Sequence, residues 1–165
     1  MSRTQSHQKL LAAAALLVAA AAMLLLFGSP GYHLVLRNSQ TGQIYEEYPI
    51  REGDRFSVEF VHSVNKSPVR DIYEVRDNTD LYVVETDYFA FGAGVQTELN
   101  PGETLSYGED GSMQVKNINI KLDPLTYMVG TVSDHILRIG EREVSLRALC
   151  GRNSRVTFTV QWRPF

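Results

Sequence analysis

Cysteine is scarce in this sequence: Cys150 is the only one among 165 residues. A lone cysteine cannot form an intrachain disulfide, which excludes the small disulfide-rich secreted scaffolds. The 135 residues that follow Pro30 are enough chain to bury a hydrophobic core without a covalent or metal staple. We therefore expect one folded domain there, with Cys150 as a small buried residue.

Acidic residues are absent from the first 31 positions. In that stretch an uninterrupted apolar run, Leu10–Phe27, follows the basic residues Arg3 and Lys9. As an α-helix, the 18 residues of this run span about 27 Å, close to the roughly 30 Å hydrocarbon core of a bilayer. The run predicts a transmembrane anchor over 10–27 and a cytoplasmic N-terminus over 1–9. The basic residues then place the C-terminal domain, 31–165, on the extracytoplasmic side.

A cleaved secretory signal is the competing interpretation of the same run. Such signals have an apolar centre of about 7–15 residues, followed by a small-x-small cleavage site. Here the small residues Ala19–Ala22 lie inside the run, and Met23–Phe27 follow them. This order favours an uncleaved signal-anchor, and therefore a single-pass protein of the inner (cytoplasmic) membrane of a bacterial cell.

Positive charge is in the minority in the rest of the chain. Beyond residue 31 there are 14 basic and 19 acidic residues, a net charge of −5. A net negative domain lacks the electrostatic footprint that nucleic acid requires. The composition therefore excludes nucleic-acid binding, and it suits a domain that stands off an anionic lipid surface.

Long segments with the 3.6-residue period of an amphipathic helix are also absent after residue 31. Instead, short segments rich in β-branched and aromatic residues recur about every ten residues, separated by turn residues. This spacing is typical of sandwiches and barrels. We predict an all-β, compact antiparallel sandwich or barrel-like domain. The expected strands cover residues 32–37, 43–48, 55–62, 69–75, 81–86, 112–122, 135–139, 142–146 and 155–162.

Two parts of the domain depart from this regular pattern. Within Ser112–Leu122 the apolar positions change parity at Lys116-Asn117, which indicates a bulge or bend. The stretch Phe89–Asp110 is rich in glycine and shows no strand pattern. Connections of about 20 residues are usually functional or mobile.

The segment Phe60–Asp71 holds the first group of candidate functional residues. It predicts a strand ending at His62, a short connection and a returning strand. Hairpin pairing would bring Asp71 near His62 or Ser63, where Lys66 would complete a small polar site. We regard His62, Ser63, Lys66 and Asp71 as candidates for contacting a ligand or a partner. The alternative is that His62 and Ser63 only satisfy backbone groups at the hairpin end.

Enzyme chemistry at this segment is disfavoured by geometry. A serine hydrolase needs its serine within hydrogen-bond reach of the imidazole, together with an oxyanion hole. Adjacent residues of a strand point to opposite faces, so His62 and Ser63 are poorly placed as base and nucleophile. We expect no enzyme activity, and a surface hydrolase is the remaining enzymatic alternative.

The segment Glu85–Gly94 holds the second group, and Glu85, Phe91, Gly92 and Gly94 are further candidates for ligand or partner contact. The two glycines lack the third glycine and the strand-to-helix context of a dinucleotide fingerprint. Ligand loops for Zn²⁺ or Ca²⁺ are absent from the sequence. We therefore expect no cofactor and no metal.

Three segments carry a resemblance to a known family: Phe60–Val69, Glu85–Gly94 and Ile136–Leu146. The first has the pattern Phe-x-His-Ser-Val-x-x-x-Pro-Val and the second Glu-Thr-x-Tyr-x-x-Phe-Gly-Ala-Gly. The third contains Ile-Leu-Arg-Ile-Gly and Val-Ser-Leu. In these segments the chain resembles the domain-of-unknown-function eighteen-fifty family, over roughly residues 32–162. Asp71 stands where that family usually has glutamate, which keeps the charge.

The resemblance implies a biological context rather than a mechanism. Members of the family are typically encoded beside the fused permease and the binding protein of TAXI-type TRAP transporters. Those transporters are sodium-linked importers of organic acids such as glutamate or 2-oxoglutarate. The resemblance therefore implies a membrane-anchored accessory or interaction protein, whose partners are the lipid bilayer and a TRAP transporter permease or solute-binding protein. An extracytoplasmic small-molecule or ion-binding sensor domain is the alternative function.

Overall fold

The computed structural model describes residues 3–27, 30–64, 66–90, 95–96 and 98–164. The chain divides into two compact units. One comprises Met1–Gly31 with Trp162–Phe165, and the other comprises Tyr32–Gln161.

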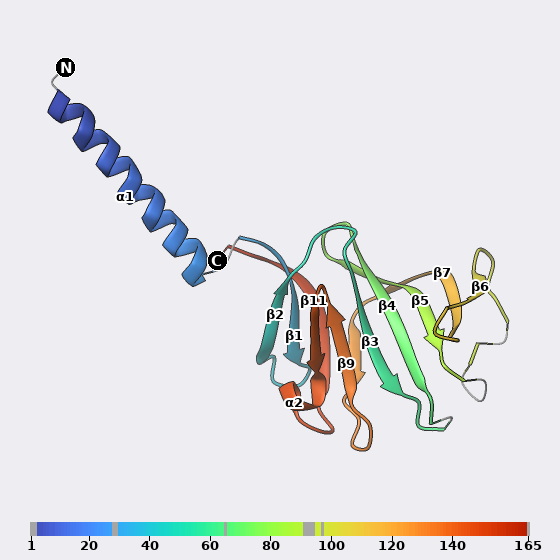
Figure 1. The fold of residues 1–165 in the computed structure, drawn as a ribbon. Coiled ribbons are helices and arrows are strands. Elements are labelled where there is room, and N and C mark those ends of the chain that lie inside the picture. Colours follow the sequence, from blue (N-terminus) through green and yellow to red (C-terminus); the bar gives the residue numbers. More distant parts are fainter. Residues whose placement is uncertain (1–2, 28–29, 65, 91–94, 97, 165) are drawn as a thin grey trace. The chain divides into compact units, whose positions relative to one another are not determined.

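Helix α1 (Arg3–Phe27) covers the segment predicted as the anchor (Figure 1). Alanine and leucine, both strong helix formers, make up most of it. In the part of the chain that the structure describes, no helix is both long enough and apolar enough to cross a membrane. The structure confirms that residues 10–27 are helical. A membrane span is not found among the described residues of this helix. The side chains of Met23–Phe27, the last part of the predicted run, lie outside the described residues.

The second unit is a β-sandwich built from two antiparallel sheets, as the strand pattern predicts. Sheet A consists of β1 (Gly31–Asn38), β2 (Ile44–Pro49), β8 (Leu125–Met128) and β11 (Arg155–Arg163). Its strand order is β2-β1-β11-β8. Sheet B consists of β3 (Arg55–Val61), β4 (Pro68–Arg76), β5 (Asp80–Tyr88), β6 (Thr104–Tyr107), β7 (Met113–Leu122), β9 (His135–Ile139) and β10 (Arg142–Ser145). Its order is β10-β9-β3-β4-β5-β7-β6 (Figure 1).

All of the predicted strands form, with ends that differ from the prediction by no more than two residues. Three short elements are not predicted: β6, β8 and the helix α2 (Leu146–Cys150). The strand β6 lies inside the glycine-rich stretch that we expected to be irregular. Helix α2 begins at the N-cap Ser145, whose side chain accepts a hydrogen bond from the Ala148 N–H.

The hydrophobic core lies between the two sheets, where alternate residues of each strand meet. Phe56 and Val58 of β3 are both buried, since alternate residues of a strand point to the same face. The ring of Phe56 stacks on that of Phe158 from β11 at a centroid distance of 6.0 Å. Trp162, two residues beyond the buried Val160 on β11, is exposed. Cys150 is half-buried rather than fully buried, and this burial raises the pKa of its thiol to about 11.

The predicted irregularity at Lys116-Asn117 is confirmed. The β5–β7 register passes from Val83 opposite Ile120 to Glu85 opposite Lys116, so one residue of β5 faces three of β7. Asn117 absorbs the extra chain with a left-handed backbone, φ 60°. Asparagine tolerates that conformation better than most residues.

Candidate functional site

A polar cluster lies between the two sheets, centred on Asp71 of β4. Tyr127 of β8 donates a hydrogen bond of 2.9 Å to Asp71 Oδ2, and Thr86 of β5 donates one of 2.9 Å to Oδ1. Tyr73, two residues farther along β4 on the same face, has its hydroxyl 3.4 Å from Oδ2. Tyr73 and Tyr127 also share a short hydrogen bond. The cluster therefore joins one strand of sheet A to two strands of sheet B.

Burial controls the ionisation of this cluster. Loss of water contact raises the pKa of Asp71, and the hydroxyls that bond its carboxylate oppose that rise. Burial and the nearby Asp71 charge raise the pKa of Tyr73. Burial, then the charges of Tyr73 and Asp71, raise the pKa of Tyr127. Both phenols therefore stay protonated as donors, and the titrating group of the cluster is Asp71, which can hold or release a proton.

Aromatic rings pack around the same cluster. His135 of β9 stacks on Phe60 of β3 at 5.3 Å, and the edge of Tyr127 meets His135 at 5.6 Å. The buried His135 ring accepts a hydrogen bond of 3.3 Å at Nδ1 from the Gly130 N–H. Burial lowers the pKa of His135, although the charge of neighbouring Asp134 opposes this. The imidazole is therefore neutral at pH 7.

The residues His62, Ser63 and Lys66 lie in the connection between β3 and β4. The Lys66 N–H donates to the His62 carbonyl at 2.9 Å. The Val64 N–H donates to His62 Nδ1 at 3.3 Å. These bonds match the alternative in which His62 satisfies backbone groups at the hairpin end. Lys66 itself has a left-handed backbone, φ 55°.

Asp71 does not join the hairpin residues. The antiparallel register of β3 and β4 pairs Val61 with Pro68 at the loop, and Asp71 with Val58 three steps farther along. We expected hairpin pairing to bring Asp71 near His62 or Ser63, and the register corrects this expectation. Asp71 lies three paired positions away from the loop that holds His62 and Ser63. Its side chain faces the core instead.

Glu85 lies on the outer face of sheet B, beside a residue that the sequence did not single out. Lys116 Nζ is 3.7 Å from Glu85 Oε1. Two residues along β5, Asp87 is only 3% exposed, and Arg70 Nη1 lies 3.5 Å from its Oδ2. Asp87 Oδ1 is buried without a hydrogen-bond partner among the described residues. Burial, reinforced by the charge of Glu85 and opposed by Arg70, raises the pKa of Asp87 to about 6.

Three exposed valines gather at one end of sheet B, and we call this surface the valine end. Val61 and Val64 of the β3–β4 hairpin are 38% and 65% exposed, and Val132, in the loop before β9, is 89% exposed. The two loops touch, since the Ser133 hydroxyl donates to the Val61 carbonyl at 3.4 Å. The valine end therefore lies beside His62 and Ser63. The candidates Phe91, Gly92 and Gly94 lie outside the described residues.

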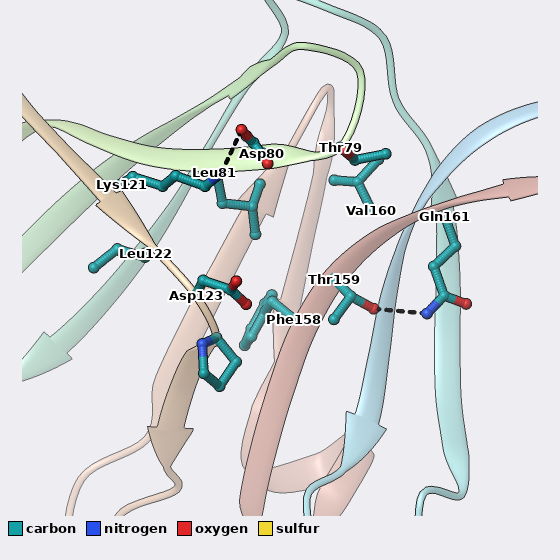
Figure 2. Close-up of a pocket in the computed structure, with 11 residues that line it drawn as sticks. Thr79, Asp80, Leu81, Lys121, Leu122, Asp123, Phe158, Thr159, Val160 and Gln161 are labelled. Atoms are coloured by element: carbon teal, nitrogen blue, oxygen red, sulfur yellow. Dashed lines mark hydrogen bonds and ion pairs between the residues drawn. The ribbon is translucent and has the colours of Figure 1, made fainter.

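A hollow of about 260 Å³ lies where β5 and β7 of sheet B meet β11 of sheet A. Figure 2 shows that two of its three charged side chains, Lys121 and Asp80, are paired with each other. Lys121 Nζ is 2.6 Å from Asp80 Oδ2, and Gln161 Nε2 donates to Thr159 Oγ1 at 3.3 Å. The apolar part of the lining consists of Leu81, Leu122, Pro124, Phe158 and Val160.

A second hollow, of about 420 Å³, opens on the outer face of sheet B, and we call it the basic hollow. It includes the sequence candidate Glu85 among residues from β3, β4, β5 and β7. Its polar lining consists of Arg55, Arg76, Glu85, Lys116, Asn117 and Asn119. Within the described part of the chain, no group of three or more His, Cys, Asp or Glu side chains is placed to hold a metal ion.

Comparison with known protein families gives a match. A family model described as "Domain of unknown function (DUF1850)" matches residues 56–146, more than half of the chain. The chain belongs to this family. The DUF1850 match runs from the second residue of β3 to the first residue of α2, so it contains the Asp71 cluster, the valine end and the basic hollow except for Arg55. It leaves out β1, β2 and β11. No curated protein and no solved structure matches the chain.

The sequence missed Tyr73, Tyr127 and Asp87 as members of polar sites. Tyr73 occupies an ordinary alternating position of β4, and β8 is too short for a periodic signal. Asp87 differs from its neighbours only through its depth in the folded sheet. Among the residues of the Asp71 cluster, only Asp71 could be noticed from the sequence, because an acidic side chain at an inward-facing strand position indicates a buried polar site.

Proposed function

We propose that this DUF1850 protein is a non-enzymatic accessory protein of a TAXI-type TRAP organic-acid transport system. Residues 10–27 hold it in the inner (cytoplasmic) membrane as a single-pass protein. Its β domain lies on the extracytoplasmic side and contacts the transporter permease or the solute-binding protein. The context that the family resemblance implies supports this proposal, and the uncharged 18-residue run Leu10–Phe27 supports the anchor.

The observation that carries the interaction role is the valine end. A single exposed valine is normal for a soluble domain, whereas apolar side chains gathered on the surface mark contact sites. Val61, Val64 and Val132 belong to two loops joined by a hydrogen bond. Burying them against a partner would recover roughly 1–2 kcal/mol for each side chain that is removed from water. The neighbouring hairpin residues His62, Ser63 and Lys66 would supply the polar rim of such a contact.

The test is co-purification of the tagged full-length protein from its native membrane. We expect the permease or the solute-binding protein to be recovered, and the Val64→Asp/Val132→Asp double variant to lose most of it. Ile120→Asp is the matched control, because Ile120 is 52% exposed but lies on β7 rather than at the valine end. Recovery of neither transporter subunit would contradict the proposal, as would equal recovery by the double variant.

The second candidate function, an extracytoplasmic small-molecule or ion-binding sensor, is favoured by the basic hollow. Cationic side chains from separate strands converge there around a volume that suits a small molecule. A thermal-shift screen of the full-length protein against small anions and metal ions tests it. A rise in unfolding temperature with a ligand supports a sensor, and the absence of any shift contradicts it.

A further inference from the structure

The basic hollow lies where two neighbouring strand pairs lose register at the same place on sheet B. The β4–β5 pairing shifts between Ile72 and Tyr73. The β5–β7 pairing shifts between Val83 and Glu85. Bulges of this kind bend a strand and re-aim its side chains, and they are frequent beside functional sites. The floor of the hollow is apolar, since Val84 and Ile118 line it and are both buried.

The charge of the hollow is opposite to that of the domain around it. Arg55, Arg76 and Lys116 line it, with Glu85 as the only carboxylate among its lining residues. Glu74 accepts hydrogen bonds from both arginines, so the three cations are accompanied by two carboxylates, Glu74 and Glu85. The rest of the β domain is net negative. A cationic hollow in an acidic domain concentrates small anions at one place on the surface.

Hydrogen bonds hold the guanidinium groups of Arg55 and Arg76 in position and use only some of their N–H donors. Glu74 Oε2 accepts from Arg55 Nε at 2.8 Å, and Glu74 Oε1 accepts from Arg76 Nε at 2.8 Å. Arg76 also donates through Nη1 to Asn119 and lies over the Tyr82 ring at 4.6 Å. A guanidinium carries five N–H donors, so these bonds use only part of each fork. Fixed forks with remaining donors match the paired oxygens of a carboxylate or phosphate.

We propose that the basic hollow is a binding site for a small oxyanion, a carboxylate or a phosphate. Arg55 and Arg76 bind its oxygens, Lys116 supplies a third positive charge, and Asn117 also lines the hollow. This inference rests on the second candidate function, for which it names the site and the ligand class. It is independent of the valine end and of any contact with a transporter.

The experiment is calorimetric titration of the purified full-length protein with succinate and, separately, with inorganic phosphate, at constant chloride. We expect one of the two anions to bind. Lys116→Gln and Arg76→Gln should each weaken that binding at least tenfold. Lys121→Gln is the matched control, because Lys121 lies on the same strand, is similarly exposed and is also ion-paired. It should bind as the wild type does.

The outcomes distinguish a failure of the proposed oxyanion site from a failure of the proposed ligand-binding function. Binding that survives both Lys116→Gln and Arg76→Gln overturns the basic hollow but leaves a ligand-binding function standing elsewhere. Binding of neither anion above the chloride background overturns the oxyanion site itself. Arg76 contacts Glu74, Asn119 and the Tyr82 ring, so the unfolding temperature of each variant is measured first. If Arg76→Gln does not fold, the result for Lys116→Gln decides.

Discussion

The Tyr127 hydroxyl donates a hydrogen bond of 2.9 Å to Asp71 Oδ2, and the two residues come from opposite sheets of the sandwich. This hydrogen bond links the two sheets across an otherwise apolar core. Thr86 and Tyr73 complete the surroundings of the carboxylate. The cluster therefore fixes how β8 sits against β4 and β5.

Removing the hydrogen bond between Tyr127 and Asp71 should destabilise the domain. Tyr127→Phe leaves the Asp71 carboxylate without one of its donors, so we expect the free energy of unfolding to fall by about 1–3 kcal/mol. Tyr73→Phe should cost less, because the Tyr73 hydroxyl is 3.4 Å from Asp71. Urea denaturation of the full-length protein measures both values. Equal losses in the two variants would contradict the central place given to Tyr127.

Asp87 should make stability fall as the pH rises. Burial raises its pKa from 3.8 to about 6, so the folded state binds the proton more tightly than the unfolded state. Its stabilising contribution is complete below pH 3.8 and is lost as the pH passes through 6. Relative to the wild type, the free energy of unfolding of Asp87→Asn should therefore rise by up to about 3 kcal/mol between pH 4 and pH 7. A difference between the two proteins that stays constant with pH would contradict this assignment.

Asp134 should show the opposite dependence on pH. Burial opposes its ionisation, but hydrogen bonds from Ser145 and from the N–H groups of Arg147 and His135 hold its pKa below the usual value. This contribution is present above pH 3.8 and is lost as the pH falls through the lowered folded pKa. Asp134→Asn should therefore lose stability relative to the wild type at pH 7, and lose less at pH 3. Urea midpoints at the two pH values measure the change.

Phe158 should be the most sensitive position of the apolar core. It is fully buried, and its ring contacts those of Phe56 and Tyr127 at 6.0 Å each. Phe158→Ala should lower the free energy of unfolding by about 3–5 kcal/mol, because it leaves a cavity between the sheets. Phe158→Leu fills most of that volume and should cost clearly less. Similar losses for the two variants would indicate that the contact between the sheets does not depend on this ring.

The strands were predictable because each signals itself locally. Phe56 and Val58 alternate with polar residues, and that period alone places β3 and its buried face. The bulge at Asn117 was predictable from the parity change on β7. The strand β8 was not predicted: its four residues alone show no period, and it lacks a hairpin signal like the Gly140-Glu141 turn beside the equally short β10.

The candidate site was less predictable, since it depends on contacts between distant parts of the chain. Asp71 was a predicted candidate, but its neighbours were expected from the hairpin and came from β5 and β8. Tyr127 lies 56 residues away in sequence. No local pattern reports which sheets will stack or how deeply Asp87 will be buried. The register of β3 and β4, rather than closeness in sequence, decided where Asp71 points.

Uptake of a labelled organic acid by cells that lack this protein tests the proposed accessory role most directly. We predict that deletion lowers uptake through the TRAP system, and that the full-length wild type or Ile120→Asp restores it. The Val64→Asp/Val132→Asp variant, produced in equal amount, should fail to restore it. Unchanged uptake after deletion would contradict the proposal that the protein serves the transporter.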